Sequence, residues 1–198
     1  LDYLHLTTNN TIFGTQFHTL PDTNVPLIAD MSSDIFSREL DYAAFDLFYA
    51  GAQKNMGPAG TTLVIVKDSL LEEMNDNVPS MMSYAVHAAK GSMFNTPPVF
   101  PVYTSMLTLE WLKEQGGIKA IQKHNEAKAK LVYDEIDRNT AFIGFAAKED
   151  LLGQVLVFYQ EGVRHVRCPD LTRTGPCPRT HRVSRTSVTT LGHRRRFW

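Results

Sequence analysis

The chain has 198 residues, of which 43% are hydrophobic and 21% charged, and its formal net charge is −1 at pH 7. This composition is typical of an ordinary globular domain with enough apolar material for a sizeable core. No apolar run approaches the roughly eighteen residues of a membrane-spanning helix, and no basic-then-apolar signal opens the chain. The sequence therefore argues against a membrane protein and favours a cytoplasmic one.

The first third of the chain alternates short apolar runs with polar turns, which is the pattern of strands. We expect strands at residues 1–6, 25–29, 45–50 and 61–66. A polar loop, Thr7–Thr11, follows the first strand, and Asp30 stands at the carboxyl end of the second. Ligands of open α/β sheets gather at that end of the strands, so Asp30 is well placed to meet one.

The remainder up to residue 150 is expected to be mainly helical. The predicted helices are residues 69–74 with Asp68 as cap, 102–113, and 118–139. The last has one apolar face at helical spacing, so we interpret it as structural and its lysines and glutamates as a solvated face. Short apolar runs at 142–146 and 155–159 are expected to be strands. This order predicts an α/β fold, with a mostly parallel sheet followed by a truncated α/β small domain.

Lys54 carries the clearest chemical signal. It stands between two predicted strands, in the segment Tyr49-Ala-Gly-Ala-Gln-Lys-Asn-Met-Gly-Pro-Ala-Gly60. Most lysines are solvated surface charges, but burial among apolar groups disfavours the ammonium form, and the amine would then attack an aldehyde more readily. The glycines follow the lysine and lack the order of a nucleotide-binding phosphate loop, so we interpret them as a tight turn that orients Lys54.

Two further segments accompany the Lys54 segment in a fixed order, namely Ala29-Asp-Met-Ser-Ser33 upstream and Ser92-Met-Phe-Asn-Thr-Pro-Pro98 downstream. Together the three closely resemble the phosphoserine aminotransferase family of class V, fold-type I enzymes, which use pyridoxal 5′-phosphate. The resemblance covers about residues 1–150. It implies the large cofactor-binding domain of that fold, followed by part of its small domain.

The resemblance implies a role for each matching residue. Lys54 would bind the aldehyde of the cofactor, and its freed amine would move the proton between the substrate Cα and the cofactor. Asp30 matches the aspartate that pairs with the pyridine nitrogen and keeps the ring an electron sink, whereas an isolated aspartate at a strand end usually forms a turn or a cap. Thr11 matches the threonine that hydrogen-bonds the phenolic oxygen, although Asn10 stands where the family has glutamate.

The phosphate of the cofactor would be held by Gln53, and by Asn95 and Thr96 of a neighbouring subunit. A shared site implies a homodimer. The implied reaction exchanges an amino group between O-phosphoserine and glutamate and their oxo acids, in serine biosynthesis. The family recognises these anions with arginine and histidine side chains. Arg38 is the only arginine close to the motifs in sequence, and no pattern assigns it to substrate.

The expected domain organisation follows from the same resemblance. Residues 1–97 would be the C-terminal part of the large domain, 98–150 the start of the small domain, and 151–198 a divergent tail. Family members are much longer, and the part that supplies much of their cofactor pocket has no counterpart here. We therefore expect a fragment, and its start at Leu1 rather than methionine agrees with this expectation.

The tail differs from the rest of the chain in charge. Residues 151–198 contain nine arginines, no lysine and two acidic residues, whereas residues 1–150 contain nine lysines and two arginines. Few aromatics lie among these arginines, which argues against nucleic-acid binding. Cys168 and Cys177 have neither the spacing nor the partners of a zinc site, so no metal is expected. We interpret the tail as a non-homologous or out-of-frame continuation that begins near Asp150.

Two alternatives stay open. Besides the phosphoserine aminotransferase interpretation, the chain could be part of another class V enzyme, such as a different aminotransferase or a desulfurase. It could also be a non-catalytic fragment whose basic tail binds an anion. Lys54 and Asp30 keep their roles in the first alternative and lose them in the second.

Overall fold

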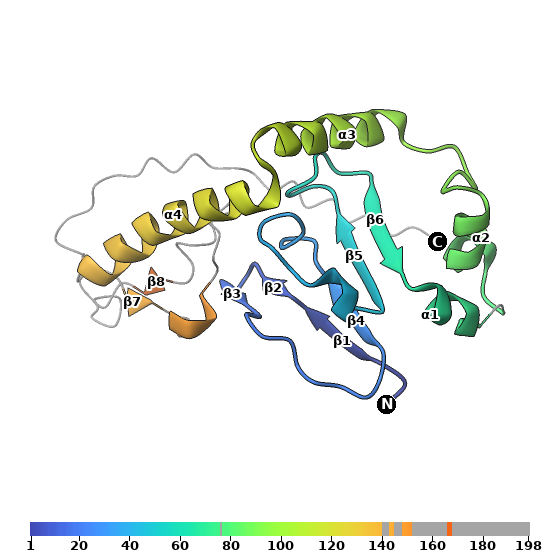
Figure 1. Ribbon diagram of the computed structural model, residues 1–198, viewed down its shortest axis with the longest axis horizontal. Coiled ribbons are helices and arrows are strands. Elements are labelled where there is room, and N and C mark those ends of the chain that lie inside the picture. The colour runs from blue at the N-terminus through green and yellow to red at the C-terminus, as the bar shows by residue number, and fades with distance from the viewer. Residues whose placement is uncertain (76, 140–142, 145–147, 152–165, 168–198) are drawn as a thin grey trace, which may run out of the picture.

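A four-stranded sheet forms the centre of the molecule, as Figure 1 shows for the computed structural model, which describes residues 1–75, 77–139, 143–144, 148–151 and 166–167. The strands lie in the order β1 (Leu4–Thr7), β4 (Leu27–Asp30), β5 (Leu47–Gly51) and β6 (Thr62–Val66). β1, β4 and β5 are parallel, and β6 is antiparallel to β5. The predicted α/β fold with a mostly parallel sheet is confirmed.

The three parallel strands end at one edge of the sheet. Thr7 of β1 is in register with Asp30 of β4, which in turn is in register with Tyr49 of β5. β4 starts later than expected, because Pro26 has no N–H to donate to the ladder; its carbonyl still accepts from the Leu4 N–H at 2.9 Å. The loops that follow Thr7, Asp30 and Gly51 therefore start side by side.

The polar segment after β1 is more ordered than the expected loop. β2 (Asn9–Asn10) pairs antiparallel with β3 (Thr15–Gln16) and forms a small hairpin. The side-chain oxygen of Asn10 accepts from the backbone N–H groups of Ile12 and Phe13, at 3.0 and 3.1 Å. This is the turn that asparagine side chains favour, and Gly14 closes it with φ of +71°. The prediction of an irregular loop was wrong here.

The helices follow the sheet in sequence. They are α1 (Asp68–Glu73), α2 (Tyr84–Ala89), α3 (Val99–Glu114) and α4 (Gly117–Arg138). Short 3₁₀ turns lie between β4 and β5 (Tyr42–Ala44), before α2 (Ser80–Met82) and after α4 (Lys148–Asp150). α3 begins before the expected residue 102 because Pro101 lies in its first turn, where the missing N–H has no partner inside the helix. Asp68 is the first residue of α1 rather than its cap, which is Lys67. α2 was not expected.

Beyond α4 the described residues are few. β7 (Ile143–Gly144) pairs with β8 (Val166–Arg167). The strand expected at 155–159, both cysteines and most of the tail lie outside the described residues. The domain boundaries at 97 and 150 stay predictions. Within the described part of the chain, no helix is long and apolar enough to cross a membrane.

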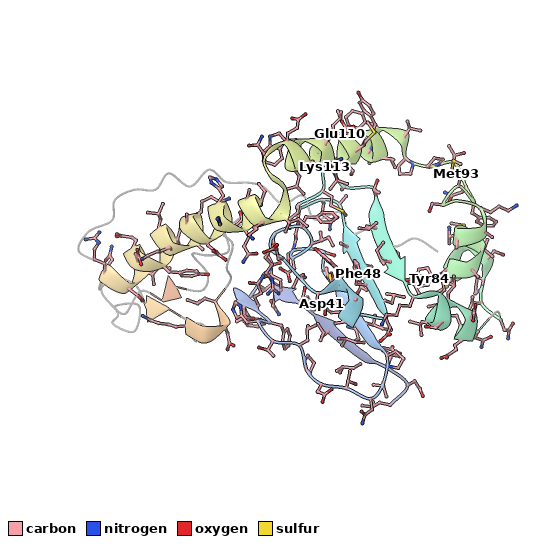
Figure 2. The ribbon with its side chains drawn as sticks, in the orientation of Figure 1. Asp41, Phe48, Tyr84, Met93, Glu110 and Lys113 are labelled. Atoms are coloured by element: carbon pink, nitrogen blue, oxygen red, sulfur yellow. The ribbon has the colours of Figure 1, made fainter. Side chains whose placement is uncertain are left out.

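The hydrophobic core belongs to the sheet and its loops. Its buried members lie between Leu6 and Met56, and include Ala29, Phe45 and Phe48. In Figure 2, Phe48 lies over the centre of the sheet, whereas Tyr84 and Met93 lie beyond its β6 edge. α1, α2 and α3 bury none of their residues, and α4 buries only Asn125 and Ala129.

Candidate active site

Hydrogen bonds join the three loops at the carboxyl edge of the parallel strands. The backbone N–H of Gly51 donates to Ser32 Oγ at 3.1 Å, and Asn9 Nδ2 donates to Ser33 Oγ at 2.8 Å. Asn55 Nδ2 donates to the carbonyl of Ile35, also at 2.8 Å. The hairpin, the loop after Asp30 and the turn that carries Lys54 are thus held as one unit.

Lys54 and Thr11 meet within this unit. The ammonium of Lys54 donates to Thr11 Oγ1 at 2.8 Å, and both side chains are partly buried. A threonine hydroxyl that accepts from one neighbour still has its own proton to donate to another. The pair therefore presents an amine and a hydroxyl donor at the same place, although they are 43 residues apart in sequence.

The turn between β5 and β6 orients Lys54. The backbone N–H groups of Met56 and Gly57 donate to the carbonyl of Ala52, at 3.2 and 2.8 Å. Gly57 has φ of +149°, which side chains rarely adopt, and a Cβ there would lie 3.1 Å from Ser105 Oγ of α3. The expected tight turn is present, and it packs closely against α3.

Asp30 ends β4 with its carboxylate anchored by the main chain. Its Oδ1 accepts the backbone N–H of Ser32 at 2.8 Å, and its own carbonyl accepts the N–H of Thr8 at 3.1 Å. Asp30 is half-buried. The neighbouring phenol of Tyr49 has its pKa raised, by burial first and then by the negative charge of Asp30.

The expected phosphate-binding residues are less closely joined. Gln53 is exposed beside Lys54, and its side-chain amide covers Gly51, where a Cβ would lie 2.4 Å from the Gln53 Oε1. Asn95 and Thr96 are exposed between α2 and α3, on a segment that runs outside the β6 edge in Figure 1. Among the described residues no hydrogen bond joins either of them to Lys54, Thr11 or Asp30. Lys54 and Thr11 therefore meet directly, Asp30 and Gln53 lie on the strand and the turn next to them, and Asn95 and Thr96 lie apart.

Sequence reasoning missed the residues that support these loops, and it left Arg38 without a role. Arg38 donates from Nε to Asp34 Oδ1 at 3.0 Å and from Nη2 to Asp34 Oδ2 at 2.8 Å, and Nη2 also donates to the Phe17 carbonyl at 2.8 Å. Asp34 is fully buried and accepts from Gln16 Nε2 as well, at 2.7 Å. Arg38 therefore locks the hairpin to the loop after Asp30. The spacing of an aspartate and an arginine four residues apart was the available signal.

A small polar cavity of about 130 Å³ lies where this loop meets α4. It is lined by Gln16, His18, Ser37, Arg38, Glu39, Gln122 and Glu126. Asn125 Nδ2 donates to the Ser37 carbonyl at 3.0 Å beside it, and the Glu39 N–H donates to Gln122 Oε1 at 2.9 Å. Because its one guanidinium is already bound by Asp34, we regard this cavity as part of the contact between the loop and α4.

No group of three or more histidine, cysteine or carboxylate side chains in the described stretches is arranged to hold a metal ion. Cys168 and Cys177 lie outside those stretches.

Comparison with known proteins adds to this geometry. The model of the family "Aminotransferase class-V" matches residues 1–166. The phosphoserine aminotransferase of Flavobacterium psychrophilum is 57% identical over 169 residues, which are 85% of this chain and 48% of that protein.

Solved structures agree. The phosphoserine aminotransferase of Bacillus circulans subsp. alkalophilus superposes with a TM-score of 0.74 at 46% identity. A pyridoxal-phosphate-bound phosphoserine aminotransferase from Trichomonas vaginalis gives a TM-score of 0.73 at 36% identity. Each comparison covers 76% of this chain and 42% of the solved one.

The chain spans about half the length of the curated relatives that it matches. The matched stretch reaches residue 166 and so continues past the expected boundary near Asp150.

Proposed function

The chain belongs to the class-V aminotransferase family, and on this premise we propose that it is part of a phosphoserine aminotransferase that uses pyridoxal 5′-phosphate. The observation that carries the proposal is the hydrogen bond between Lys54 and Thr11 on loops that also join the loop after Asp30. These loops contain the residue types that this cofactor requires. The similarity of the chain to phosphoserine aminotransferases, at 57% identity to one of them, supports the choice within the family.

The donor set fits the cofactor. The Lys54 amine would hold its aldehyde, the Thr11 hydroxyl would donate to its phenolic oxygen, and the Asp30 carboxylate would face its ring nitrogen. When bound, the cofactor supplies an electron sink for the pair of electrons that leaves the substrate Cα. The Ser32 N–H donates to Asp30 Oδ1 at 2.8 Å and so holds one oxygen of this carboxylate in place.

The protein's own groups would then do three things. Lys54 Nζ, once released from the aldehyde, would take the proton from the substrate Cα and return one in the second half of the exchange. Thr11 would keep that amine in place, since Lys54 already donates to it at 2.8 Å. Gln53, next to Lys54, would turn its amide from Gly51 to the phosphate.

A second copy of the chain would complete the site through Asn95 and Thr96. Both residues are exposed and lie apart from Lys54, which is what a contribution to a partner's site requires. α3 supports the same homodimer, because its many apolar residues are not confined to one face and yet none of its residues is buried in this chain. Its exposed side chains include Val99, Phe100, Val102, Tyr103, Met106, Leu107 and Trp111.

The substrates would be O-phosphoserine and glutamate with their oxo acids, in cytoplasmic serine biosynthesis. The arginines and histidines that bind these anions would come from parts of the protein that this chain does not span. In the same scheme residues 1–97 belong to the cofactor domain, 98–150 to the small domain, and the basic tail lies outside both.

Chemical trapping tests the proposal. The purified chain is mixed with pyridoxal phosphate, reduced with borohydride and digested, and the labelled lysine is identified by mass spectrometry. We expect the label on Lys54, a loss of most of it in Lys54→Ala, and no loss in the matched variant Lys67→Ala, whose ammonium is bound by Asp46 at 2.9 Å. A label spread evenly over the surface lysines would refute the site. Amino-donor screening of the whole protein then separates phosphoserine from the substrates of other class V enzymes.

A further inference from the structure

A tyrosine and a histidine lie on the same face of the sheet as Asp30. Tyr49 of β5 is in register with Asp30 of β4, and paired residues of neighbouring strands direct their side chains to the same face. His5 of β1 is in register with Ile28, two residues before Asp30, and so shares that face. His5 Nε2 lies 3.1 Å from the Tyr49 hydroxyl, and the two rings are stacked with centroids 6.0 Å apart.

The Tyr49 hydroxyl also interacts electrostatically with the Asp30 carboxylate. The pKa of Tyr49 is raised by burial, then by the negative charge of Asp30, by Tyr84 of α2, and by a hydrogen bond with the Asp30 side chain. His5, Asp30 and Tyr84 are thus the titratable groups that face this phenol from β1, β4 and α2. The phenol stands between an imidazole and a carboxylate.

The direction of these bonds follows from which of the groups carry a proton to donate. Asp30 is the register neighbour of Tyr49 and offers a carboxylate on the same face of the sheet. A carboxylate only accepts and a phenol has a single proton, so between these two groups Tyr49 would be the donor. The bond between His5 and Tyr49 must then run from an Nε2–H of His5 to the phenol oxygen. This assigns the tautomer of His5, with the proton on Nε2.

We infer that His5 and Tyr49 form a chain of hydrogen-bond donors that ends on Asp30 and holds its carboxylate in place. The two are positioning residues, since they act through Asp30 and not on substrate. Successive donors polarise one another, so the bond to Asp30 is stronger with His5 present than without it. The inference rests on the proposed function for its purpose, because Asp30 would face the pyridine nitrogen of the cofactor and must be held in position to do so. The donor chain itself does not depend on the cofactor.

The first test uses the chain without cofactor and follows the ionisation of Tyr49 by NMR of ring-labelled tyrosine. Asp30→Asn removes the negative charge, so Tyr49 should lose its proton at a pH lower by several tenths of a unit or more. His5→Leu removes a donor that stabilises the phenolate, so the midpoint should rise, and His5→Gln, which retains an N–H donor, should restore it in part. Asp41→Asn, which removes an exposed carboxylate elsewhere, is the matched control and should leave the midpoint unchanged.

Two outcomes would overturn the donor chain. An unchanged Tyr49 midpoint in Asp30→Asn would show that the phenol does not interact with the carboxylate. A lower midpoint in His5→Leu would show that the phenol donates to the imidazole, which is the reverse of the inferred direction.

The second test addresses the purpose of the chain. The protein is loaded with pyridoxal phosphate labelled with ¹⁵N in the ring, and the nitrogen shift reports the protonated fraction. Tyr49→Phe should lower that fraction, whereas Tyr42→Phe, which removes a hydroxyl from a tyrosine of the core region, should not. An equal fraction in Tyr49→Phe and the parent chain would overturn the positioning role. Failure of the parent chain to capture the cofactor at Lys54 would instead refute the proposed function, and the first test would still decide the donor chain.

Discussion

The sheet with its loops and the helical segment α1 to α3 contrast in where they place apolar side chains. The sheet buries its own, with Ala29 and Ala50 fully covered and Phe45 only 2% exposed. The helical segment is equally apolar but leaves Phe100 at 72% and Trp111 at 51% exposure. The sheet is therefore a complete core, whereas the helical segment leaves an extended apolar surface exposed, of the kind that marks an interaction site.

The largest expected effect lies in the sheet. Phe45→Ala leaves a cavity next to Phe48 and should lower the free energy of unfolding by about 4 kcal/mol. Phe100→Ala removes the same atoms from α3 and should change it by less than about 0.5 kcal/mol. Urea denaturation measures both. Equal losses would show that α3 is as well packed as the sheet and would break the contrast.

A buried ion pair should behave like the core. Asp34→Ala leaves Arg38 without its carboxylate, and because Asp34 is fully buried we expect a loss of about 3 kcal/mol. Asp134→Ala breaks the exposed pair with Lys130 on α4 and should cost about 0.5 kcal/mol or less. If thermal and urea unfolding gave similar losses for the two variants, the loop after Asp30 would be less tightly held than its hydrogen bonds indicate.

Protonation of Asp46 at low pH should lower the free energy of unfolding. Burial acts to raise the pKa of Asp46, but bonds from the Leu27 N–H and from Lys67 outweigh it and hold the pKa below its usual value. A carboxylate with a lowered pKa stabilises the fold above its unfolded pKa, and this contribution is lost as the pH falls through the folded value. Between about pH 5 and pH 2, unfolding free energy should fall by about 1 kcal/mol more in the parent chain than in Asp46→Asn. Parallel pH dependence in the two proteins would contradict this account.

The smallest expected change in stability accompanies a change in assembly. Trp111→Ser on α3 should alter the free energy of unfolding by less than about 0.5 kcal/mol, because the side chain is half exposed. It should, however, weaken self-association measured by sedimentation. Lys113→Ser, two residues further along and also exposed, is the control and should leave association unchanged. Association that resists Trp111→Ser would place the contact surface elsewhere.

Most regular elements were predictable from the sequence, because runs such as Leu47–Gly51 and Thr62–Val66 carry their own apolar pattern. The hairpin of Asn9–Asn10 and Thr15–Gln16 was not, since strands of two residues are too short to show a period and depend on a side-chain turn. α2, with six residues, failed for the same reason.

The site was predictable in part. The strand pattern placed Asp30 at the carboxyl edge of the sheet, and the glycines after Lys54 predicted the turn that carries it, while the chemical roles of both residues stay predictions. The role of Arg38 was not predictable, because only the packed structure shows that Asp34 is buried and takes both guanidinium bonds. His5 and Tyr49 were missed because they lie on β1 and β5 and meet across β4. The order of strands in the sheet cannot be inferred from the apolar pattern of one sequence.

The turn that carries Lys54 leans on the start of α3 at two points. A Cβ on Gly57 would lie 3.1 Å from Ser105 Oγ, and one on Gly60 would lie 3.1 Å from Pro101 Cγ. Neither glycine leaves room for a side chain, so the turn packs closely against α3 at both points. A displacement of α3 relative to the sheet would therefore also displace the turn that carries Lys54.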